Sequence, residues 1–305
     1  MIFLDRQAIA ERHDPRALIE ALAQAFTGDI TAPPRGHHAL GKTEEDGTLL
    51  VMPAWRNGGG IGVKMVAVLP RNSARGKPTV DGGYMLLGDD AEPSAILDAK
   101  YLTLIRTAAI SALAASRMTG TTAGALLMVG AGALAPHLIR AHCAVRRFQR
   151  VLIWARRQEQ AAALAEVLTM EGVPAVAIAD LESAQGEAAL ISCATLATEP
   201  LVRGELLTPG AHVDLIGGFR PDMREADDDT VRRANIATDT RAALHEAGDL
   251  SQPVATGALD PARVLDLPAL LSGASFAPGD YDISLFKSVG TAVADFATAE
   301  HLLSR

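Results

Sequence analysis

The stretch TTAGALLMVGAGALAPHLIRAH, Thr121–His142, carries no acidic residue and no lysine or arginine before Arg140. Its length and apolar character match a membrane-spanning helix, which needs about 20 such residues. The same stretch also divides into a strand (ALLMVG), a glycine turn and a helix (ALAPHLIRAHCAV). We favour this division, because three glycines and a proline interrupt the apolar run, and we expect no membrane association.

The turn itself, Gly130–Ala135, has the pattern GxGxxA. The first glycine of such a turn allows a tight bend, the second lets a pyrophosphate approach the backbone, and the third position needs only a small residue. The helix that follows offers its free N–H groups to the phosphates. We therefore expect a dinucleotide to bind at Gly130, Gly132, Ala133 and Leu134; the alternative is a tight βα turn without a ligand.

The end of the next strand, LIWARRQEQ, indicates which dinucleotide binds. Sites for NAD usually place Asp or Glu there to hold the ribose 2′-hydroxyl. This chain has Arg156 and Arg157 instead, and two guanidinium groups suit a 2′-phosphate. The sequence thus favours NADP(H), with NAD(H) as the second possibility, unless the arginines only flank a solvated helix start.

The composition is that of a globular chain of 305 residues, 49% of them hydrophobic. At roughly 100–200 residues a domain, two domains are expected. The net charge of −8 and the absence of a basic run argue against a nucleic-acid surface, which needs clustered Lys and Arg. Cys143 and Cys193 lie in separate apolar runs, and the first residues show no secretory signal, so we expect a cytoplasmic protein.

Strands and helices alternate from residue 125 onwards, with strands at ALLMVG, RVLIWA, VPAVAIA, AALISCAT and AHVDLIGG. This alternation predicts an α/β fold with a doubly wound parallel sheet of Rossmann type. Upstream, GTLLVMPAW, GIGVKMVAVLP and GGYMLLGD read as strands without helices between them, which predicts a mixed or antiparallel sheet. Asp14 and Pro15 begin a predicted helix, residues 91–118 read as one long helix, and residues 284–305 read as a short strand or loop and a helix.

Several separated motifs carry a family resemblance. In chain order they are GIGVKMV, GKPT, LTLIRTAAISALAA, GAGALAPHLIRA, EPLVRGELLTPGAHVDLIGGF, EAGDL and LFKSVGTAVADF. With these motifs the chain resembles the ornithine cyclodeaminase/μ-crystallin family, which includes alanine dehydrogenases and ketimine reductases. The resemblance implies a Rossmann domain at 116–277, inserted into a second α+β domain for substrate binding and dimerisation that is formed by 1–115 and 278–305. It also implies a homodimer.

Two basic residues are candidates for catalysis. Arg35 lies in PPRGHH, and its guanidinium fork suits a substrate carboxylate, which is what its family counterpart binds; the alternative is a surface loop arginine. Lys64 shares one strand face with Val66 and Val68, so it either reaches out to water or lies in a pocket where burial lowers its pKa. The resemblance implies that Lys64 acts at the substrate carboxylate and the reaction centre.

Arg106 stands on an otherwise apolar helix face, where an unpaired charge is costly, so it needs an anion. The resemblance implies that this anion is the cofactor pyrophosphate, and a buried structural ion pair is the alternative. Other residues match family positions that line the cofactor, although some suit an ordinary turn or strand end equally well: Thr79, Thr195, Gly217 and Ser288. Val289 and Gly290 match a segment close to the nicotinamide and the substrate.

Phe219 marks a departure from one branch of the family. Ornithine cyclodeaminases carry an aspartate directly after the glycine pair, and this chain reads LIGGFRPDMRE. A phenyl ring cannot accept a proton or pair with an ammonium group, which makes cyclodeamination of ornithine doubtful. Phe219 is instead expected to form an apolar wall of the substrate pocket.

The expected function is therefore NADPH-dependent reduction of a cyclic ketimine, Δ1-pyrroline-2-carboxylate or Δ1-piperideine-2-carboxylate, to L-proline or L-pipecolate. The alternatives are an alanine dehydrogenase, an ornithine cyclodeaminase, and a non-catalytic NADPH-dependent binding protein like μ-crystallin. No metal is expected, because His37 and His38 have no matching cluster of His, Cys or carboxylate residues.

Overall fold

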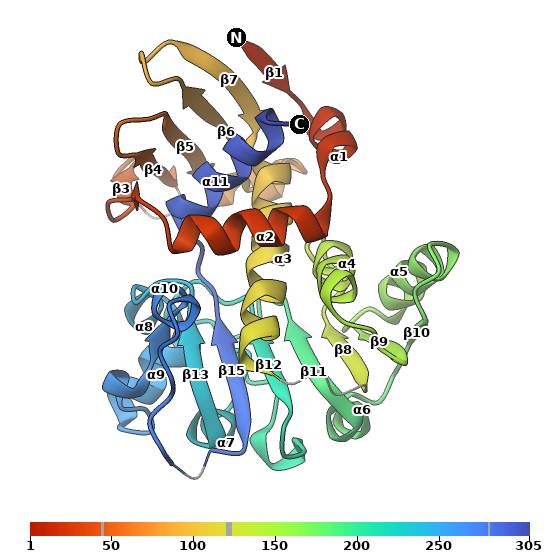
Figure 1. The fold of residues 1–305 in the computed structure, drawn as a ribbon. Helices are drawn as coiled ribbons and strands as arrows, with labels where there is room; N and C mark the ends of the chain where they lie inside the picture. The colour runs from red at the N-terminus through yellow and green to blue at the C-terminus, as the bar shows by residue number, and fades with distance from the viewer. Residues whose placement is uncertain (44–45, 120–123, 280) are drawn as a thin grey trace. The chain divides into compact units, whose positions relative to one another are not determined.

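The computed structural model describes residues 1–43, 46–119, 124–279 and 281–305 (Figure 1). Residues 121–123, at the start of the apolar stretch, lie outside the described residues. The chain forms two compact units, Met1–Arg106 with Thr291–Arg305, and Thr107–Gly290. The boundaries between the units thus lie at 106/107 and 290/291, whereas the predicted ones are 115/116 and 277/278. The strand pairing described below explains the difference at the second boundary.

The first unit begins with strand β1 (Ile2–Leu4) and helices α1 (Arg6–Arg12) and α2 (Pro15–Phe26). The predicted start of α2 is confirmed, since the Asp14 side chain accepts hydrogen bonds from the backbone N–H groups of Arg16 and Ala17. Pro15 occupies the first turn, where its missing N–H costs little.

The described residues of the first unit form a sheet of seven strands, and this sheet is mixed, which is one of the two predicted alternatives. The strands lie in the order β1, β7 (Pro93–Asp98), β6 (Val80–Leu87), β5 (Ile61–Val68), β4 (Thr48–Arg56) and β2 (Ile30–Thr31), with β3 (Gly36–Ala39) also paired to β4. Among the described strand pairs of this sheet, only β1 and β7 run parallel, and the other pairs are antiparallel. A short 3₁₀ helix, Pro70–Arg75, follows β5.

Helices α2 and α11 (Ala292–Leu303) lie on one face of this sheet (Figure 1). The side chains under α11 are buried, and Met52, Lys64 and Tyr84 lie opposite one another on neighbouring strands. The other face is apolar but half-buried or exposed; Val51, Val63, Met65 and Met85 belong to it, among others. This period of two residues is what a sheet with one covered face requires.

The predicted long helix at 91–118 is wrong in its first part. Residues Pro93–Asp98 form strand β7, and helix α3 begins only at Ala99 and ends at Met118. Ala95 and Leu97 are buried while their neighbours are not, and β7 pairs with both β6 and β1. The Asp98 side chain then accepts a hydrogen bond from Tyr101 N at 2.8 Å, which marks the start of the helix.

The second unit contains an eight-stranded sheet in which every pair is parallel. The order is β10 (Ala175–Ala177), β9 (Arg150–Trp154), β8 (Ala125–Val129), β11 (Ala188–Cys193), β12 (His212–Leu215), β15 (Ile283–Lys287), β13 (Ala234–Thr238) and β14 (Leu265–Asp266). The predicted Rossmann-type sheet is thus confirmed. Because β15 pairs with β12 and β13, residues 283–290 belong to this unit rather than to the domain predicted from 278 onwards.

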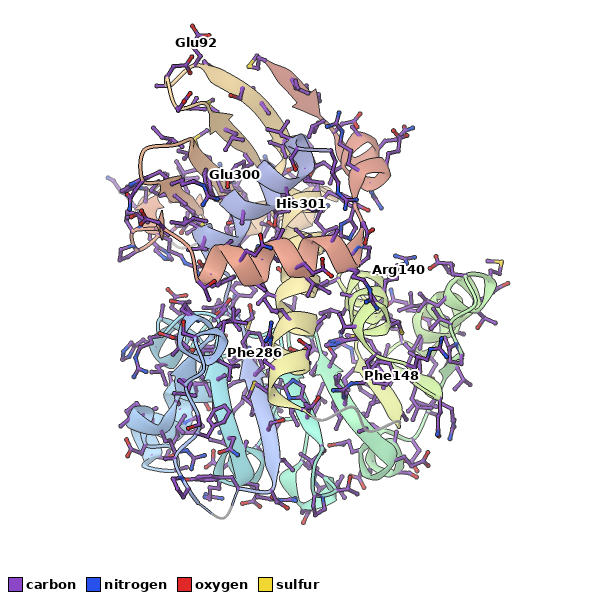
Figure 2. All side chains as sticks on the ribbon, viewed as in Figure 1. Glu92, Arg140, Phe148, Phe286, Glu300 and His301 are labelled. Carbon is purple, nitrogen blue, oxygen red and sulfur yellow. The ribbon has the colours of Figure 1, made fainter. Side chains whose placement is uncertain are left out.

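Helices join these strands: α4 (Ala135–Val145), α5 (Gln158–Met170), α6 (Leu181–Glu187), α7 (Asp228–Arg233), α8 (Ala243–Glu246), α9 (Gly248–Thr256) and α10 (Leu267–Leu271). Two 3₁₀ helices, Gly204–Leu206 and Pro261–Arg263, complete the unit. Its core is formed by fully buried strand residues such as Leu127, Ile191 and Val213, with Phe286 of β15 labelled in Figure 2. No helix among the described residues is both long and apolar enough to cross a membrane.

A buried polar cluster joins α3 and α4 to the sheet. The Asp214 carboxylate on β12 accepts hydrogen bonds from Ser111 of α3 and, at 2.7 Å, from Ser192 of β11. Nε2 of His142 on α4 lies 3.3 Å from Asp214 Oδ2, the oxygen that accepts both of these bonds. Ser, His and Asp meet here, but each is at most 1% exposed, so the cluster fixes packing and is closed to a substrate.

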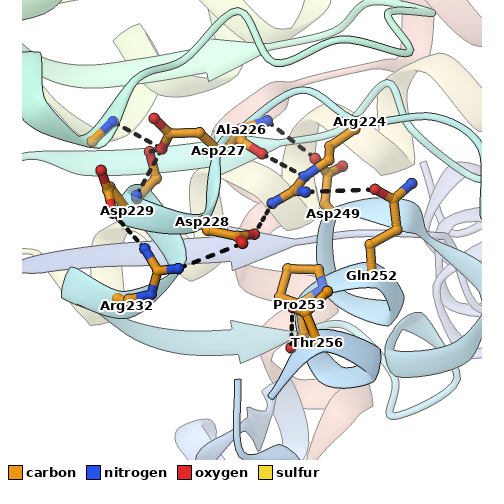
Figure 3. A network of polar contacts seen from close by, with 12 residues as sticks. Arg224, Ala226, Asp227, Asp228, Asp229, Arg232, Asp249, Gln252, Pro253 and Thr256 are labelled. Carbon is orange, nitrogen blue, oxygen red and sulfur yellow. Dashed lines mark hydrogen bonds and ion pairs between the residues drawn. The ribbon is translucent and has the colours of Figure 1, made fainter. Parts of the chain in front are cut away.

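The segment after β12 is held by a second polar network (Figure 3). The Arg224 guanidinium donates to the carbonyl of Ala226 at 3.0 Å and to Gln252 at 3.5 Å, and it pairs with Asp228 of α7. Asp249 of α9 accepts a hydrogen bond from Ala226 N at 3.2 Å. These contacts fix the loop that leaves the carboxyl end of β12, the edge at which α/β sheets bind ligands.

Candidate active site

The glycine turn after β8 has the geometry of a phosphate cradle. Gly130 has a φ of +110°, and a Cβ there would lie 2.7 Å from the carbonyl oxygen of Ala194. At Gly132 a Cβ would meet nothing within 4 Å, so the backbone is open to an approaching group. Leu134 precedes α4 without a side-chain cap, and the positive end of the helix dipole lies at this turn, where it favours an anion. The residues present fit a pyrophosphate.

Arg156 and Arg157 follow β9 directly, as the sequence predicted. Both side chains are exposed, and neither forms an ion pair with a described residue. Arg157 precedes α5 and makes no capping hydrogen bond. Two guanidinium groups therefore stand at the strand end that contacts the adenosine ribose in Rossmann folds.

Thr195 and Gly217 are brought together by a carboxylate that sequence reasoning missed. Glu225 accepts hydrogen bonds from Thr195 N (2.7 Å) and Thr195 Oγ1 (2.9 Å) on one oxygen, and from Gly217 N (2.8 Å) on the other. A Cβ at Gly217 would overlap the backbone of Thr195. Glu225 thus ties together the loops that follow β11 and β12.

A fully buried charge cluster lies beneath these loops. Lys287 Nζ, at the end of β15, is 2.9 Å from Asp249 Oδ2 and 3.9 Å from Glu225 Oε2. Burial raises the pKa of Glu225, whereas Asp249 and Glu225 raise the pKa of Lys287 against the effect of its own burial. These contacts attach the carboxyl end of β15 to α9 and to the loop that follows β12.

The segment 288–290 is fixed by Asp239, which follows β13 and was also missed. Asp239 accepts hydrogen bonds from Ser288 Oγ (2.6 Å), Val289 N (3.1 Å) and Gly290 N (2.6 Å). Gly290 has a φ of +85°, which favours glycine there. Phe219, in the loop after β12, is 48% exposed.

The first unit contains a cavity of about 230 Å³ that brings Arg35, Lys64 and Arg106 together. Its apolar wall includes Leu50, Met52 and Val66, and its exposed rim includes Asp81 and Lys100. Thr79 is exposed, and its carbonyl accepts a hydrogen bond from Leu69 N at 2.7 Å. His37 and His38 are exposed on β3, and no group of described residues has the composition of a metal site.

Arg106 has a contact that differs from the expected one. Its Nε lies 2.8 Å from Oδ1 of Asp295, whose other oxygen lies 2.6 Å from Lys64 Nζ. Asp295 is fully buried on α11, and Lys64 and Arg106 are only 4% and 5% exposed. The described contact of Arg106 is therefore a buried ion pair, the alternative to a pyrophosphate contact. Arg106 Nη1 is buried without a hydrogen-bond partner among the described residues.

The charges in this cavity alter one another. Burial lowers the pKa of Lys64 to about 8, with Asp295 acting against that shift and Arg106 adding to it. Burial alone would raise the pKa of Asp295, but Lys64 and Arg106 hold it below its usual value. The cavity is thus lined by a lysine with a pKa of about 8 and by a permanent cation, and both pair with a carboxylate outside the lining that stays ionised.

Comparison with known proteins identifies the family. A model of the ornithine cyclodeaminase/mu-crystallin family matches residues 7–305. The chain belongs to this family. The Delta(1)-pyrroline-2-carboxylate reductase of Paracoccus denitrificans is 41% identical over 261 residues, which cover 84% of this chain and 83% of that protein.

Solved structures share the fold along the whole length of this chain. The Delta(1)-pyrroline-2-carboxylate reductase of Thermococcus litoralis, in complex with NADH and L-proline, matches with a TM-score of 0.91 and 26% identity, over 100% of this chain and 97% of that one. The iminosuccinate reductase of Paracoccus denitrificans, in complex with NAD⁺, matches with a TM-score of 0.89 and 26% identity, over 100% and 95%. These relatives agree with the expected class of protein, an NAD(P)-dependent enzyme of this family.

Proposed function

We propose that the protein reduces a cyclic ketimine, Δ1-pyrroline-2-carboxylate or Δ1-piperideine-2-carboxylate, to L-proline or L-pipecolate. The observation that carries the proposal is the cavity in which Arg35, Lys64 and Arg106 meet. In an α-imino acid the carboxylate is bonded directly to the C=N carbon. The three cationic side chains of the cavity are therefore suited to contact both the carboxylate and the imine group. The names of the relatives described above support this substrate class.

The carboxylate of the substrate binds to Arg35 and Arg106. Lys64 and Arg106 share the single carboxylate of Asp295, which leaves a net positive charge on two side chains that are almost fully buried. A buried excess charge favours a ligand of opposite sign. The unpartnered Nη1 of Arg106 supplies a donor for one carboxylate oxygen.

Lys64 supplies the proton. With a pKa of about 8 its ammonium form predominates at neutral pH, and it protonates the imine nitrogen or keeps it protonated. When bound, the nicotinamide supplies a hydride to the C=N carbon. The product gains one hydride at C2 and one proton at nitrogen, so a lysine that gives up its proton near neutral pH suits the step. Phe219, Val289 and Gly290 stay assigned to the substrate pocket by resemblance.

NADP(H) is the preferred cofactor in this proposal, with NAD(H) as the second possibility. The relatives bound to NADH and NAD⁺ support a dinucleotide at Gly130, Gly132, Ala133 and Leu134. The exposed Arg156 and Arg157 support the additional 2′-phosphate. Thr79, Thr195, Gly217 and Ser288 remain candidates for cofactor contacts on family resemblance.

The proposed enzyme is a cytoplasmic homodimer. The face of the first unit's sheet opposite α11 is apolar along β4 and β5 and at Met85 of β6, and side chains such as Met65 are left exposed there, which suits a second copy of the chain. Cys143 and Cys193 form no disulfide, in keeping with a reducing compartment.

The test is the product formed from Δ1-pyrroline-2-carboxylate and NADPH, identified by chiral chromatography. L-Proline is expected with the wild type and with Lys42→Met, which removes an exposed lysine. Lys64→Met is expected to lower the rate at least a hundredfold. Absence of proline with both NADPH and NADH, together with absence of L-pipecolate from Δ1-piperideine-2-carboxylate, would refute the proposal, and proline formed from ornithine would point to the cyclodeaminase instead.

A further inference from the structure

We propose that Asp295 is the positioning residue of this cavity, which holds the Lys64 ammonium and the Arg106 guanidinium side by side and keeps Lys64 charged. The inference deepens the function proposed above and rests on it only for the part that Lys64 plays in proton transfer. Asp295 acts through its two partners, because Lys64 and Arg106 line the cavity and Asp295 does not.

Each oxygen of the Asp295 carboxylate is paired with a different cationic side chain. Oδ2 of Asp295 lies 2.6 Å from Lys64 Nζ, and Oδ1 lies 2.8 Å from Arg106 Nε. Asp295 is in the first turn of α11, where the helix dipole favours a negative charge, and Thr291 caps that turn by accepting from Val293 N at 3.0 Å. Strand β5, helix α3 and helix α11 thus meet at one buried carboxylate.

The other groups that face Lys64 cannot replace this negative charge. Arg35, which precedes β3, is itself a cation. Tyr84, opposite Lys64 on β6, has its hydroxyl buried without a described partner, and burial raises its pKa, so it stays neutral. At the rim of the cavity, Asp81 is exposed to solvent and Lys100 is a further cation.

Removal of the carboxylate therefore leaves Lys64 and Arg106 as adjacent buried cations. Arginine stays protonated at any physiological pH, so the repulsion is relieved by loss of the Lys64 proton. A neutral Lys64 neither attracts a carboxylate nor donates a proton to an imine. Loss of Arg106 has the opposite effect, because Asp295 then serves Lys64 alone.

The experiment measures the pKa of Lys64 directly, without substrate or cofactor. The chain's lysines are Lys42, Lys64, Lys77, Lys100 and Lys287, so selective ¹³C labelling at lysine Cε gives few NMR signals, and Lys64→Arg assigns the relevant one. We expect Asp295→Asn to lower the pKa of Lys64 by at least one unit and Arg106→Gln to raise it. Glu300→Gln is the matched control, since Glu300 is also on α11 but is 31% exposed and pairs with Arg56 at 2.6 Å (Figure 2).

The pH profile of imine reduction supplies the second measurement. In Asp295→Asn we expect kcat/KM at pH 8 to fall at least tenfold, with partial recovery at lower pH, whereas Asp295→Glu retains the wild-type profile more closely. An unchanged Lys64 pKa in folded Asp295→Asn would overturn the inference; if that variant does not fold, an unchanged pKa in Arg106→Gln does so. If Asp295→Asn shifts the pKa of Lys64 as expected but the wild type reduces no imine, only the proposed function is refuted.

Discussion

At the level of a single residue, the pKa of Lys64 makes the rate of the proposed reduction depend on pH. Its pKa of about 8 means that the ammonium form is present below this pH and is lost as the pH rises through it. The kcat/KM for imine reduction should therefore be level below pH 7 and fall about tenfold per unit above pH 8. Initial rates between pH 6 and 10 measure this. In Lys64→Arg the alkaline limb should vanish, and a wild-type profile that stays flat to pH 10 would contradict the assignment.

Arg156 and Arg157 give a prediction for cofactor choice. Each charge-assisted hydrogen bond to a 2′-phosphate contributes about 1.5–3 kcal/mol, or roughly tenfold or more in affinity. Replacing both arginines by alanine should raise the KM for NADPH at least tenfold and leave the KM for NADH nearly unchanged. Equal changes for the two cofactors would show that the arginines do not contact the 2′-phosphate.

The sequence predicted the residues whose own surroundings are unusual and missed those whose partners are distant. Lys64 among valines and Arg106 on an apolar helix face stand out locally. Asp295 does not, because an aspartate in the first turn of a helix is common at the surface. Its burial depends on Lys64 and Arg106, which lie far away in the chain, and the same holds for Glu225 beside Thr195.

At the scale of elements, the strand–turn–helix unit around Gly130 allows a paired test. Gly130→Ala forces a side chain into a left-handed conformation and towards the Ala194 carbonyl, so it should lower the free energy of unfolding by about 1–3 kcal/mol. Gly132→Ala has open space and should keep that stability while weakening dinucleotide binding. Urea unfolding and NADPH titration of both variants separate the two effects. Equal stability losses would contradict this description of the turn.

Element boundaries were predictable where local signals decide them. Asp14 and Pro15 fix the start of α2, and the glycine turn fixes the start of α4. Residues 93–98 were misread as helix because their apolar residues fit either period, and pairing with β6 and β1 decides the outcome. The place of β15 in the parallel sheet likewise depends on partners distant in the chain, β12 and β13.

At the scale of the whole molecule, the apolar outer face of the first unit's sheet predicts a dimer that a single charge disrupts. Met65 is 43% exposed on β5, so Met65→Glu should leave the fold intact and shift the protein towards monomer. Val176→Glu is the matched control, because Val176 is 42% exposed on β10 of the second unit. Sedimentation velocity measures both. A dimer that survives Met65→Glu, or a wild type that is monomeric, would contradict this interface.

In the proposed function, the protein transfers a hydride to the C=N carbon of a cyclic α-imino acid. The most direct measurement incubates the protein with Δ1-pyrroline-2-carboxylate and NADPH carrying deuterium at both C4 positions, and locates the label by mass spectrometry and NMR. We expect L-proline with one deuterium, at C2, and we expect Lys64→Met to form it much more slowly. Recovery of unlabelled proline, or of unchanged substrate and cofactor, would contradict the proposed function.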